Sequence, residues 1–360
     1  MLTLGTASLL PPGGHAHASG EDGVEVAAGP AVWEASVRPR FRLRPDFEAP
    51  TDVIIGFSDA FPKEATELAT AIAPAAHVVV LLAEDTDAEI GQEWFMSLPP
   101  ETQRRTRLLT GYPVDSLWVR DYGPFISHAG TMTRWLDTSY LLERPLDDQF
   151  PLWLGDSLEV DPIPTDSAID GGAVISDGQG HCISTLDYWA DDQIADGEDS
   201  QDVLHQLGCI DLLLVPALRL DATTHVDMVA QFISPERILV GQVDPEEDAE
   251  DAERMDEAAA AIAAWAKAGH RELEIVRVPT PVLSEGSYYA YVNLLQLEGR
   301  AVVPHYPQIS RRREAAILAT LESALERPVV AVDMGELRSL GGVVHCATFN
   351  LRLPDGAPWR

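Results

Sequence analysis

The segment VAQFISPERILVGQV, residues 229–243, is the stretch that decides the fold class. Two apolar runs flank a short polar turn, which predicts a β-hairpin. Residues 245–269 follow with an alanine- and acid-rich pattern that predicts a helix, and EIVRVPT, residues 274–280, predicts a further strand. The unit is therefore a hairpin, a helix and a strand.

The same unit recurs along the chain. Further hairpins are predicted at 123–136, 172–185 and 292–306, helices at 63–76, 199–209 and 312–325, and strands at 211–217 and 329–335. With the chain ends counted, the unit is present about five times, which is typical of a closed repeat architecture. A doubly wound sheet also alternates strands and helices, but it needs no hairpin in each unit. We expect an α/β ring of small mixed sheets with helices outside, as a single domain over residues 31–360.

Composition limits the classes of function. The 360 residues are 46% hydrophobic and 23% charged, which is typical of a globular protein. The formal net charge of -33 disfavours a nucleic-acid partner and is compatible with a cationic substrate. Lys63 and Lys267 are the only lysines in the sequence, and this depletion with excess acid favours general adaptation to salty surroundings.

The cysteines and the N-terminus bear on the cellular compartment. Cys182, Cys209 and Cys346 provide no even-numbered disulfide framework, so we expect a reducing, cytoplasmic setting with Cys182 and Cys209 as inert buried residues. Residues 1–30 are rich in Gly, Ala and Pro and are expected to be poorly ordered. Their Ala-His-Ala segment resembles a signal-peptide cleavage site without a basic region before it, which leaves export as the alternative. No membrane span is expected, because no run reaches the roughly 18 apolar residues required.

Polar motifs precede the predicted hairpins. They are WVRDYGP (118–124), DGGA (170–173), TTHVDM (223–228), YAYVN (289–293) and, near the C-terminus, GGVVHCATF (341–349). In a radial array, equivalent strand ends meet at the axis, so these motifs can share one pocket. Taken alone, WVRDYGP is also compatible with a salt-bridged strand end followed by a turn.

Two motifs carry groups capable of catalysis. His225 and Asp227 are two residues apart, so on a strand their side chains face the same way. A satisfied histidine at a strand end remains an alternative, and no metal is expected because the chain has no His-x-x-x-His or Cys-x-x-Cys pair. Cys346 lies in a predicted apolar strand, where Gly341 and Gly342 allow close approach of backbone or ligand. It is either an inert core thiol or a nucleophile that needs a partner such as His225.

The combined set consists of one thiol, one histidine and the carboxylates of Asp121, Asp170 and Asp227. Three acids in one pocket repel each other unless a cation lies between them. A guanidinium is planar, always charged and pairs bidentately with carboxylates. Its carbon is a poor electrophile, so its attack calls for a strong nucleophile such as a thiolate. The set predicts hydrolysis at a guanidinium.

These five motifs, in this order, resemble those of the agmatine deiminase and bacterial-type peptidylarginine deiminase family of the pentein superfamily. That family's patterns are approximately Trp-x-Arg-Asp-x-Gly-Pro, Glu-Gly-Gly-Asn, Gly-His-x-Asp, Ser-Tyr-x-Asn and Gly-Gly-x-x-His-Cys-x-Thr-Gln-Gln. The resemblance covers nearly the whole chain after about residue 34. It implies a five-bladed α/β propeller, no cofactor, and conversion of agmatine to N-carbamoylputrescine and ammonia.

The resemblance also implies roles for individual residues. Cys346 would attack the guanidinium carbon, and Asp121 and Asp227 would hold the guanidinium nitrogens. His225 would protonate the departing ammonia and then activate water. The remaining positions that match the family's site are the histidine-orienting Asp170 and the pocket-lining Trp118 and Asn293. Arg120 is expected to pair with acids or backbone and keep Asp121 in place.

Several positions depart from the family's patterns. Asp170 replaces Glu, Ala173 replaces Asn, Thr224 replaces Gly and Ala290 replaces Ser. Free arginine and peptidyl-arginine are therefore alternative substrates, and amidino transfer to an amine is an alternative reaction. A non-catalytic protein that binds cationic ligands is the alternative from another class, and a thiol protease is disfavoured because it needs no clamping carboxylates. The sequence predicts no oligomeric state.

Overall fold

The hairpin predicted at 229–243 is present in the computed structural model. Strand β12 (Ala230–Ser234) pairs antiparallel with β13 (Arg237–Gln242), and β13 pairs in parallel with β14 (Glu274–Pro279). Helix α8 (Ala249–Ala268) connects the two parallel strands, and it begins where the Asp248 carboxylate accepts two backbone N–H groups of the first turn. Its apolar face packs into the same core as the fully buried residues of β13. Local sequence signals and tertiary burial therefore agree in this unit.

The structure describes residues 32–34, 41–140, 143–190, 200–284, 286–335, 337 and 343–353. The segment 1–30, expected to be poorly ordered, lies outside these residues, and so do Gly341 and Gly342. Within the described chain the strands form five small sheets. Besides the sheet β12-β13-β14, they are, in order of pairing, β1 (Val32–Glu34), β11 (Asp211–Val215), β10 (His181–Thr185) and β9 (Ile175–Ser176); β15 (Leu295–Leu297), β16 (Arg300–His305) and β17 (Val329–Asp333); β18 (Thr348–Leu351), β3 (Asp52–Phe57), β4 (His77–Ala83) and β5 (Thr106–Val114); and β2 (Arg42–Leu43), β6 (Phe125–Ala129), β7 (Met132–Ser139) and β8 (Ile163–Ala168).

Every sheet contains an antiparallel pair followed by a parallel strand, as the repeat predicts. In four sheets the antiparallel pair is a local hairpin. In the fifth, β18 from the end of the chain pairs antiparallel with β3 from its beginning, and β3 pairs in parallel with β4. The last described strand therefore lies in one sheet with strands from the first third of the chain.

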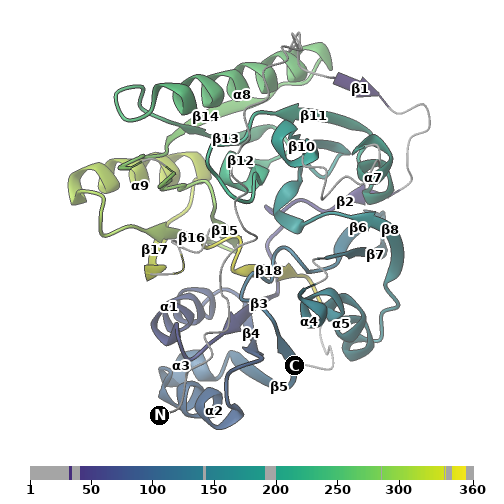
Figure 1. The fold of residues 1–360 in the computed structure, drawn as a ribbon, viewed down its shortest axis with the longest axis vertical. Helices are drawn as coiled ribbons and strands as arrows, with labels where there is room; N and C mark the ends of the chain where they lie inside the picture. Colours follow the sequence, from purple (N-terminus) through teal and green to yellow (C-terminus); the bar gives the residue numbers. More distant parts are fainter. Residues whose placement is uncertain are drawn as a thin grey trace.

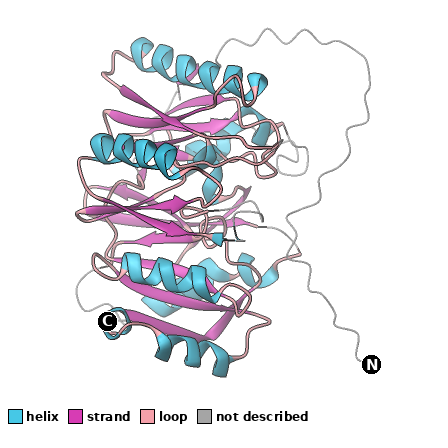
Figure 2. Ribbon diagram, turned by 90° about the vertical axis from the view of Figure 1, so that its left-hand side faces the viewer, coloured by secondary structure: helices cyan, strands magenta, loops and turns pink. Residues whose placement is uncertain are grey.

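The predicted helices are confirmed, and shorter ones accompany them. The helices are α1 (Pro62–Ile72), α2 (Ala88–Ser97), α3 (Pro100–Gln103), α4 (Pro145–Asp148), α5 (Phe150–Leu158), α6 (Leu186–Trp189), α7 (Ser200–Leu207) and α9 (Arg311–Leu325), together with α8 and two 3₁₀ turns, η1 (Gly171–Ala173) and η2 (Val226–Met228). Figure 1 shows α1, α8 and α9 on the outside, with the strands toward the middle of the view. Figure 2 shows helices and strands alternating along the long axis. None of the described helices is long and apolar enough to cross a membrane.

The expectation for two of the cysteines is wrong. Cys182 on β10 and Cys209, just after α7, form a buried disulfide with Cα atoms 5.7 Å apart. That separation is within bridging range, and it arises because α7 returns the chain to the sheet beside β10. An odd cysteine count does not reveal such a pair. Cys346 is the one free cysteine of the three, and it is buried.

Candidate functional site

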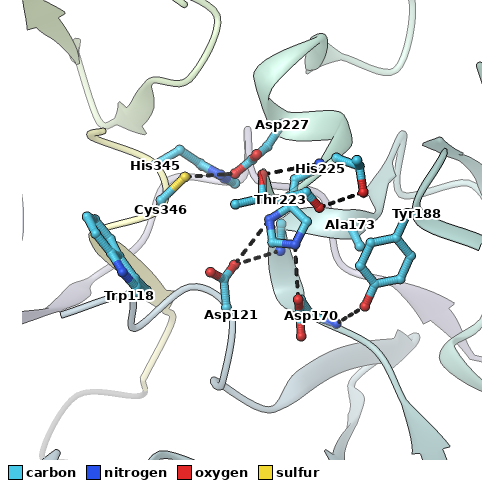
Figure 3. Close-up of polar contacts among 12 residues, drawn as sticks. Trp118, Asp121, Asp170, Ala173, Tyr188, Thr223, His225, Asp227, His345 and Cys346 are labelled. Carbon is cyan, nitrogen blue, oxygen red and sulfur yellow. Dashed lines mark hydrogen bonds and ion pairs between the residues drawn. The ribbon is translucent and has the colours of Figure 1, made fainter. Parts of the chain in front are cut away.

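Five turns hold the predicted site residues, and each turn directly precedes one strand of a different sheet. Trp118 and Asp121 precede β6, Asp170 and η1 precede β9, His225 and η2 precede β12, Asn293 precedes β15, and Cys346 precedes β18. Figure 3 shows the predicted side chains that it labels, Trp118, Asp121, Asp170, His225, Asp227 and Cys346, gathered around one space. The repeat thus brings residues that are far apart in sequence to one place.

The predicted local structure of two motifs is wrong, although their side chains meet as expected. His225 is the extended residue that starts the 3₁₀ turn η2, and Asp227 lies within that turn rather than on a strand. Cys346 lies in a turn that ends before β18, not in a strand. A turn of this size has no periodicity of its own, so the neighbouring apolar residues made both motifs resemble strands.

His225 lies between two carboxylates. Its Nε2 is 3.0 Å from Asp170 Oδ2, and its Nδ1 is 3.6 Å from Asp121 Oδ1. The shorter Asp170 side chain therefore reaches the imidazole where the family's pattern has glutamate. The backbone N–H of Asp170 donates to the Tyr188 hydroxyl (2.9 Å), and the Tyr188 ring lies beside His225 with ring centroids 5.7 Å apart. These contacts fix the ring with Nδ1 directed toward Asp121.

The glycines of the DGGA motif allow this close approach. A Cβ on Gly171 would lie 2.0 Å from the Arg120 carbonyl oxygen, and one on Gly172 would lie 2.5 Å from His225 Nδ1. Neither contact is possible for a larger residue without moving the site. The Gly172 N–H donates to Asp121 Oδ1 (3.2 Å), so the same turn also holds this carboxylate.

Cys346 is held by Asn293 and Asp227. The Asn293 side-chain amide donates to Sγ (3.2 Å), and its Oδ1 accepts the backbone N–H groups of His345 and Cys346 at 2.9 and 3.4 Å. The thiol lies 3.5 Å from Asp227 Oδ2. Asn293 and Asp227 are both 0% exposed, and Cys346 is 3% exposed. The nucleophile candidate is thus fixed by buried groups from two other turns.

Burial and mutual charge control the protonation of the site. Burial is the main cause that raises the pKa of Asp121 to about 7, and the carboxylates of Asp170 and Asp227 add to it while His225 opposes it. For His225, burial opposes the charged ring, but the surrounding carboxylates outweigh it and raise the pKa to about 10. Burial, reinforced by Asp227 and Asp121, raises the pKa of the Cys346 thiol well above its usual value. At neutral pH the histidine is therefore charged and the thiol protonated.

Two buried polar atoms of the site have no hydrogen-bond partner among the described residues. They are Asp227 Oδ1 and His225 Nδ1. A buried carboxylate oxygen and a buried ring N–H are costly when unpaired. Trp118 is half-buried, and its ring lies on the side of the site that holds Cys346 and Asp121. Together these features leave an acceptor, a donor and an aromatic wall around the thiol.

Two residues that contact the site, Asp46 and His345, are not among the predicted site residues. Asp46 lies between β2 and β3, and its Oδ1 is 2.9 Å from the Arg120 guanidinium. Arg120 also donates its backbone N–H to the Cys346 carbonyl (3.2 Å), so the expectation that it pairs with an acid and with backbone is confirmed. In the sequence, His345 is distinguished as a site residue only by its position next to Cys346. Asp46 stands in none of the five motifs.

Thr224 departs from the family's glycine at a position where the backbone favours glycine. Its φ is 52°, in the left-handed region that is unfavourable for a β-branched residue. We expect Thr224→Gly to raise the free energy of unfolding by about 0.5–1 kcal/mol, because relief of strain exceeds the added entropy of the unfolded chain. Denaturant titration measures this.

The matched control for this substitution is Thr133→Gly. Thr133 is exposed on β7, and its φ is not positive, in contrast to that of Thr224. Glycine there is expected to lower stability by about 0.5–1 kcal/mol. Equal destabilisation by both substitutions would contradict the strain at Thr224.

Comparison with known proteins agrees with this geometry. The sequence profile described as Porphyromonas-type peptidyl-arginine deiminase matches residues 50–351. The chain belongs to this family. The resemblance inferred from the motifs is thereby confirmed, and family membership supports chemistry at a guanidino group.

Individual relatives of this deiminase family are distant. A Streptomyces avermitilis protein named "Putative agmatine deiminase" is 26% identical over 265 residues, which cover 65% of this chain and 74% of the relative. The agmatine deiminase of Enterococcus faecalis superposes with a TM-score of 0.73 at 19% identity, covering 88% of this chain and 98% of that one. C. jejuni agmatine deiminase gives a TM-score of 0.71 at 17% identity, covering 87% and 96%. Structural likeness at this identity demonstrates the shared fold.

Proposed function

We propose that the protein is a deiminase that hydrolyses a guanidinium group to a ureido group and ammonia, with agmatine as the substrate. One observation carries the proposal: Asp227, whose Oδ2 lies 3.5 Å from the buried Cys346 thiol, has its buried Oδ1 without a hydrogen-bond partner among the described residues. A guanidinium supplies the missing N–H donors in a planar arrangement that suits carboxylates. The names of the relatives favour agmatine, while the family's description favours peptidyl-arginine.

Substrate binding is expected to activate the thiol. A guanidinium between Asp121 and Asp227 neutralises the two carboxylates that, together with burial, raise the pKa of Cys346. The thiol then loses its proton to solvent. The thiolate adds to the guanidinium carbon, and the protonated His225 donates its Nδ1 proton to the departing nitrogen as the C–N bond breaks. Ammonia and a cysteine thiouronium result.

Hydrolysis of the thiouronium restores the enzyme. His225, now neutral, takes a proton from water, and the hydroxide adds to the thiouronium carbon. The C–S bond then breaks, the thiolate of Cys346 leaves, and the remaining hydroxyl proton passes to ammonia as ammonium. When the product departs, the thiolate takes back a proton from solvent. Asp170, 3.0 Å from Nε2, stabilises the charged imidazole in both steps. The net reaction consumes one water. We also infer that the five sheets are the blades of a five-bladed propeller, because a turn before one strand of each sheet contributes to this site.

Ammonia release is the direct test. Purified enzyme in salt is given agmatine, free arginine and an arginine peptide side by side. Turnover of agmatine alone supports the proposal, whereas turnover of the peptide or of arginine keeps the chemistry and changes the substrate. No release from any of the three rejects the proposed function.

The disulfide affects the proposed location. Disulfides persist in oxidising compartments and are rare in reducing cytosol. The buried Cys182–Cys209 pair therefore weighs against the expected cytoplasmic setting and favours export. An exported enzyme would encounter peptides or extracellular guanidines, so export favours these as substrates.

The pH dependence follows from Asp121. Only its ionised form holds a cation, so the contribution of Asp121 is present above its pKa of about 7 and lost as pH falls through that value. We expect kcat/KM for agmatine to fall about tenfold per pH unit below about pH 6. The corresponding fall in kcat is expected at lower pH, because bound guanidinium lowers the pKa of Asp121. Steady-state kinetics from pH 5 to 9 measure both, and a kcat/KM that is flat from pH 5 to 8 would contradict the assignment.

A further inference from the structure

His345 is a buried histidine between two carboxylates, and the mechanism above makes no use of it. Its Nδ1 is 2.8 Å from Asp227 Oδ2, and its Nε2 is 3.3 Å from Asp46 Oδ2. The residue is 1% exposed. Figure 3 shows His345 and Cys346 on the same side of Asp227. A ring that is hydrogen-bonded to one acid and within ion-pair distance of a second acid, from a different segment, is a specific arrangement rather than core filling.

The charged groups facing this imidazole are Asp46, Arg120 and Asp227. Burial and Arg120 act to lower the pKa of His345, but Asp46 and Asp227 outweigh them, and the net shift is upward. Burial also opposes ionisation of Asp46, yet Arg120 and His345 hold the pKa of this carboxyl well below its usual range. The hydrogen bond from Nδ1 to Asp227 and the Asp46 carboxylate 3.3 Å from Nε2, which has no hydrogen-bond partner among the described residues, both favour the imidazolium form. The geometry and the charges thus agree on a protonated ring.

This ring determines which oxygen of Asp227 is available. Oδ2 receives Nδ1–H of His345 and lies 3.5 Å from the Cys346 thiol, whereas Oδ1 has no partner. A carboxylate held in this way cannot rotate to exchange its oxygens without losing a charged hydrogen bond. We propose that His345 is a positioning residue, which orients Asp227 so that Oδ1 faces the guanidinium. The inference rests on the proposed function, in which Asp227 binds the guanidinium.

Asp46 and Arg120 extend this arrangement to the neighbouring turn. Arg120 holds Asp46 Oδ1 at 2.9 Å and is adjacent to Asp121 in the chain. Its backbone N–H donates to the Cys346 carbonyl. A single chain of contacts therefore runs from the turn of Asp121 through Asp46 and His345 to Asp227. The two carboxylates proposed to hold the guanidinium are positioned relative to each other by this chain.

Substitution of His345 tests the proposal. In His345→Asn the amide can donate to Asp227 from near the Nδ1 position but carries no charge, whereas His345→Leu has neither donor nor charge. We expect kcat/KM to fall about tenfold in His345→Asn and about 100-fold or more in His345→Leu at pH 8. In His345→Asn most of the loss is expected in KM, because a misoriented Asp227 holds the guanidinium less well in the ground state as well as in the transition state.

His305 provides the matched control. Its Nδ1 lies 2.8 Å from Glu314 Oε2, the same distance as in the His345–Asp227 pair, but the residue is on β16, outside the site. His305→Asn and His305→Leu should leave both kcat/KM and KM within about twofold. A merely structural role for His345 would lower stability and kcat without raising KM, and that result would overturn the proposal.

A second readout does not depend on turnover. With ¹⁵N-histidine labelling, NMR should show the resonances lost in His345→Asn as a doubly protonated ring between pH 6 and 9. A neutral tautomer in this range would overturn the inference even if the enzyme is active. If the wild type releases no ammonia from any guanidine, the proposed function fails, whereas the ring's charge still tests the local arrangement. Should His345→Leu fail to fold, the asparagine variant and the NMR measurement decide.

Discussion

Cys346→Ser is expected to lower kcat for ammonia release by at least about 10⁴-fold, the scale on which loss of a covalent nucleophile is measured in other enzymes. The guanidinium carbon is a weak electrophile, and a serine hydroxyl is far harder to ionise than a thiol in the same buried, acidic surroundings. Initial rates with agmatine in salt, at enzyme concentrations high enough to detect the residual rate, measure the loss.

Thiol counting accompanies this experiment, because Cys346 is the one free cysteine. Unfolded, non-reduced wild type should titrate one thiol and Cys346→Ser none. The two proteins should share circular dichroism spectra and melting temperature. Retention of more than a few per cent of the wild-type rate in Cys346→Ser would contradict covalent catalysis by this residue.

Reactivity of the folded wild type separates an enzyme from a non-catalytic binder of cations. An alkylating reagent that carries an amidinium should react at Cys346, since it brings the cation that neutralises Asp121 and Asp227. Guanidine binding with no thiol reaction and no ammonia would support the binder. Asn293 and Asp227 both contact Sγ, so a reagent whose cation binds Asp227 lies beside the thiol.

Sequence periodicity was sufficient for the repeating unit because its signals are local. The alternation in 229–243 and the alanine-rich helix that follows produced β12, β13 and α8 within a few residues. The turns that carry the site were harder. η1 and η2 are three residues each, and their shape is imposed by packing of Gly171 and Gly172 against Arg120 and His225. No periodic pattern encodes such contacts.

Contacts between residues far apart in the chain could not be predicted from the sequence either. Asp46 reaches His345 across about 300 positions of the chain, from an irregular segment with no motif. The Cys182–Cys209 bridge was missed because counting cysteines ignores which of them α7 brings together. In contrast, Asp121, His225, Asp227 and Cys346 stand in motifs, which is why the sequence predicts them to lie together, and the structure brings them to one place. The groups that contact them from outside the motifs required the structure.

Asp227→Asn is expected to lower kcat/KM for agmatine by about 10³-fold, close to the cost of losing a buried charged partner. The carboxylate is 0% exposed, its Oδ2 accepts from His345, and its Oδ1 is the oxygen proposed to face the guanidinium. An asparagine amide in this place presents either one neutral acceptor or an N–H group that opposes the substrate's own donors. Both outcomes remove the negative charge that balances the cation in a dry site.

Asp251→Asn is the matched control for Asp227→Asn. Asp251 is also 0% exposed and carries charge-dependent hydrogen bonds, from the Arg219 backbone N–H and the Tyr288 hydroxyl, but it lies on α8 away from the site. Its substitution should lower the melting temperature and leave kcat/KM within about twofold. Comparable loss of kcat/KM in both variants would mean that Asp227 acts through stability rather than through the substrate. Loss confined to Asp227→Asn, with the fold retained, identifies this carboxylate as a contact of the cation, because the two substitutions remove the same charge from equally buried positions.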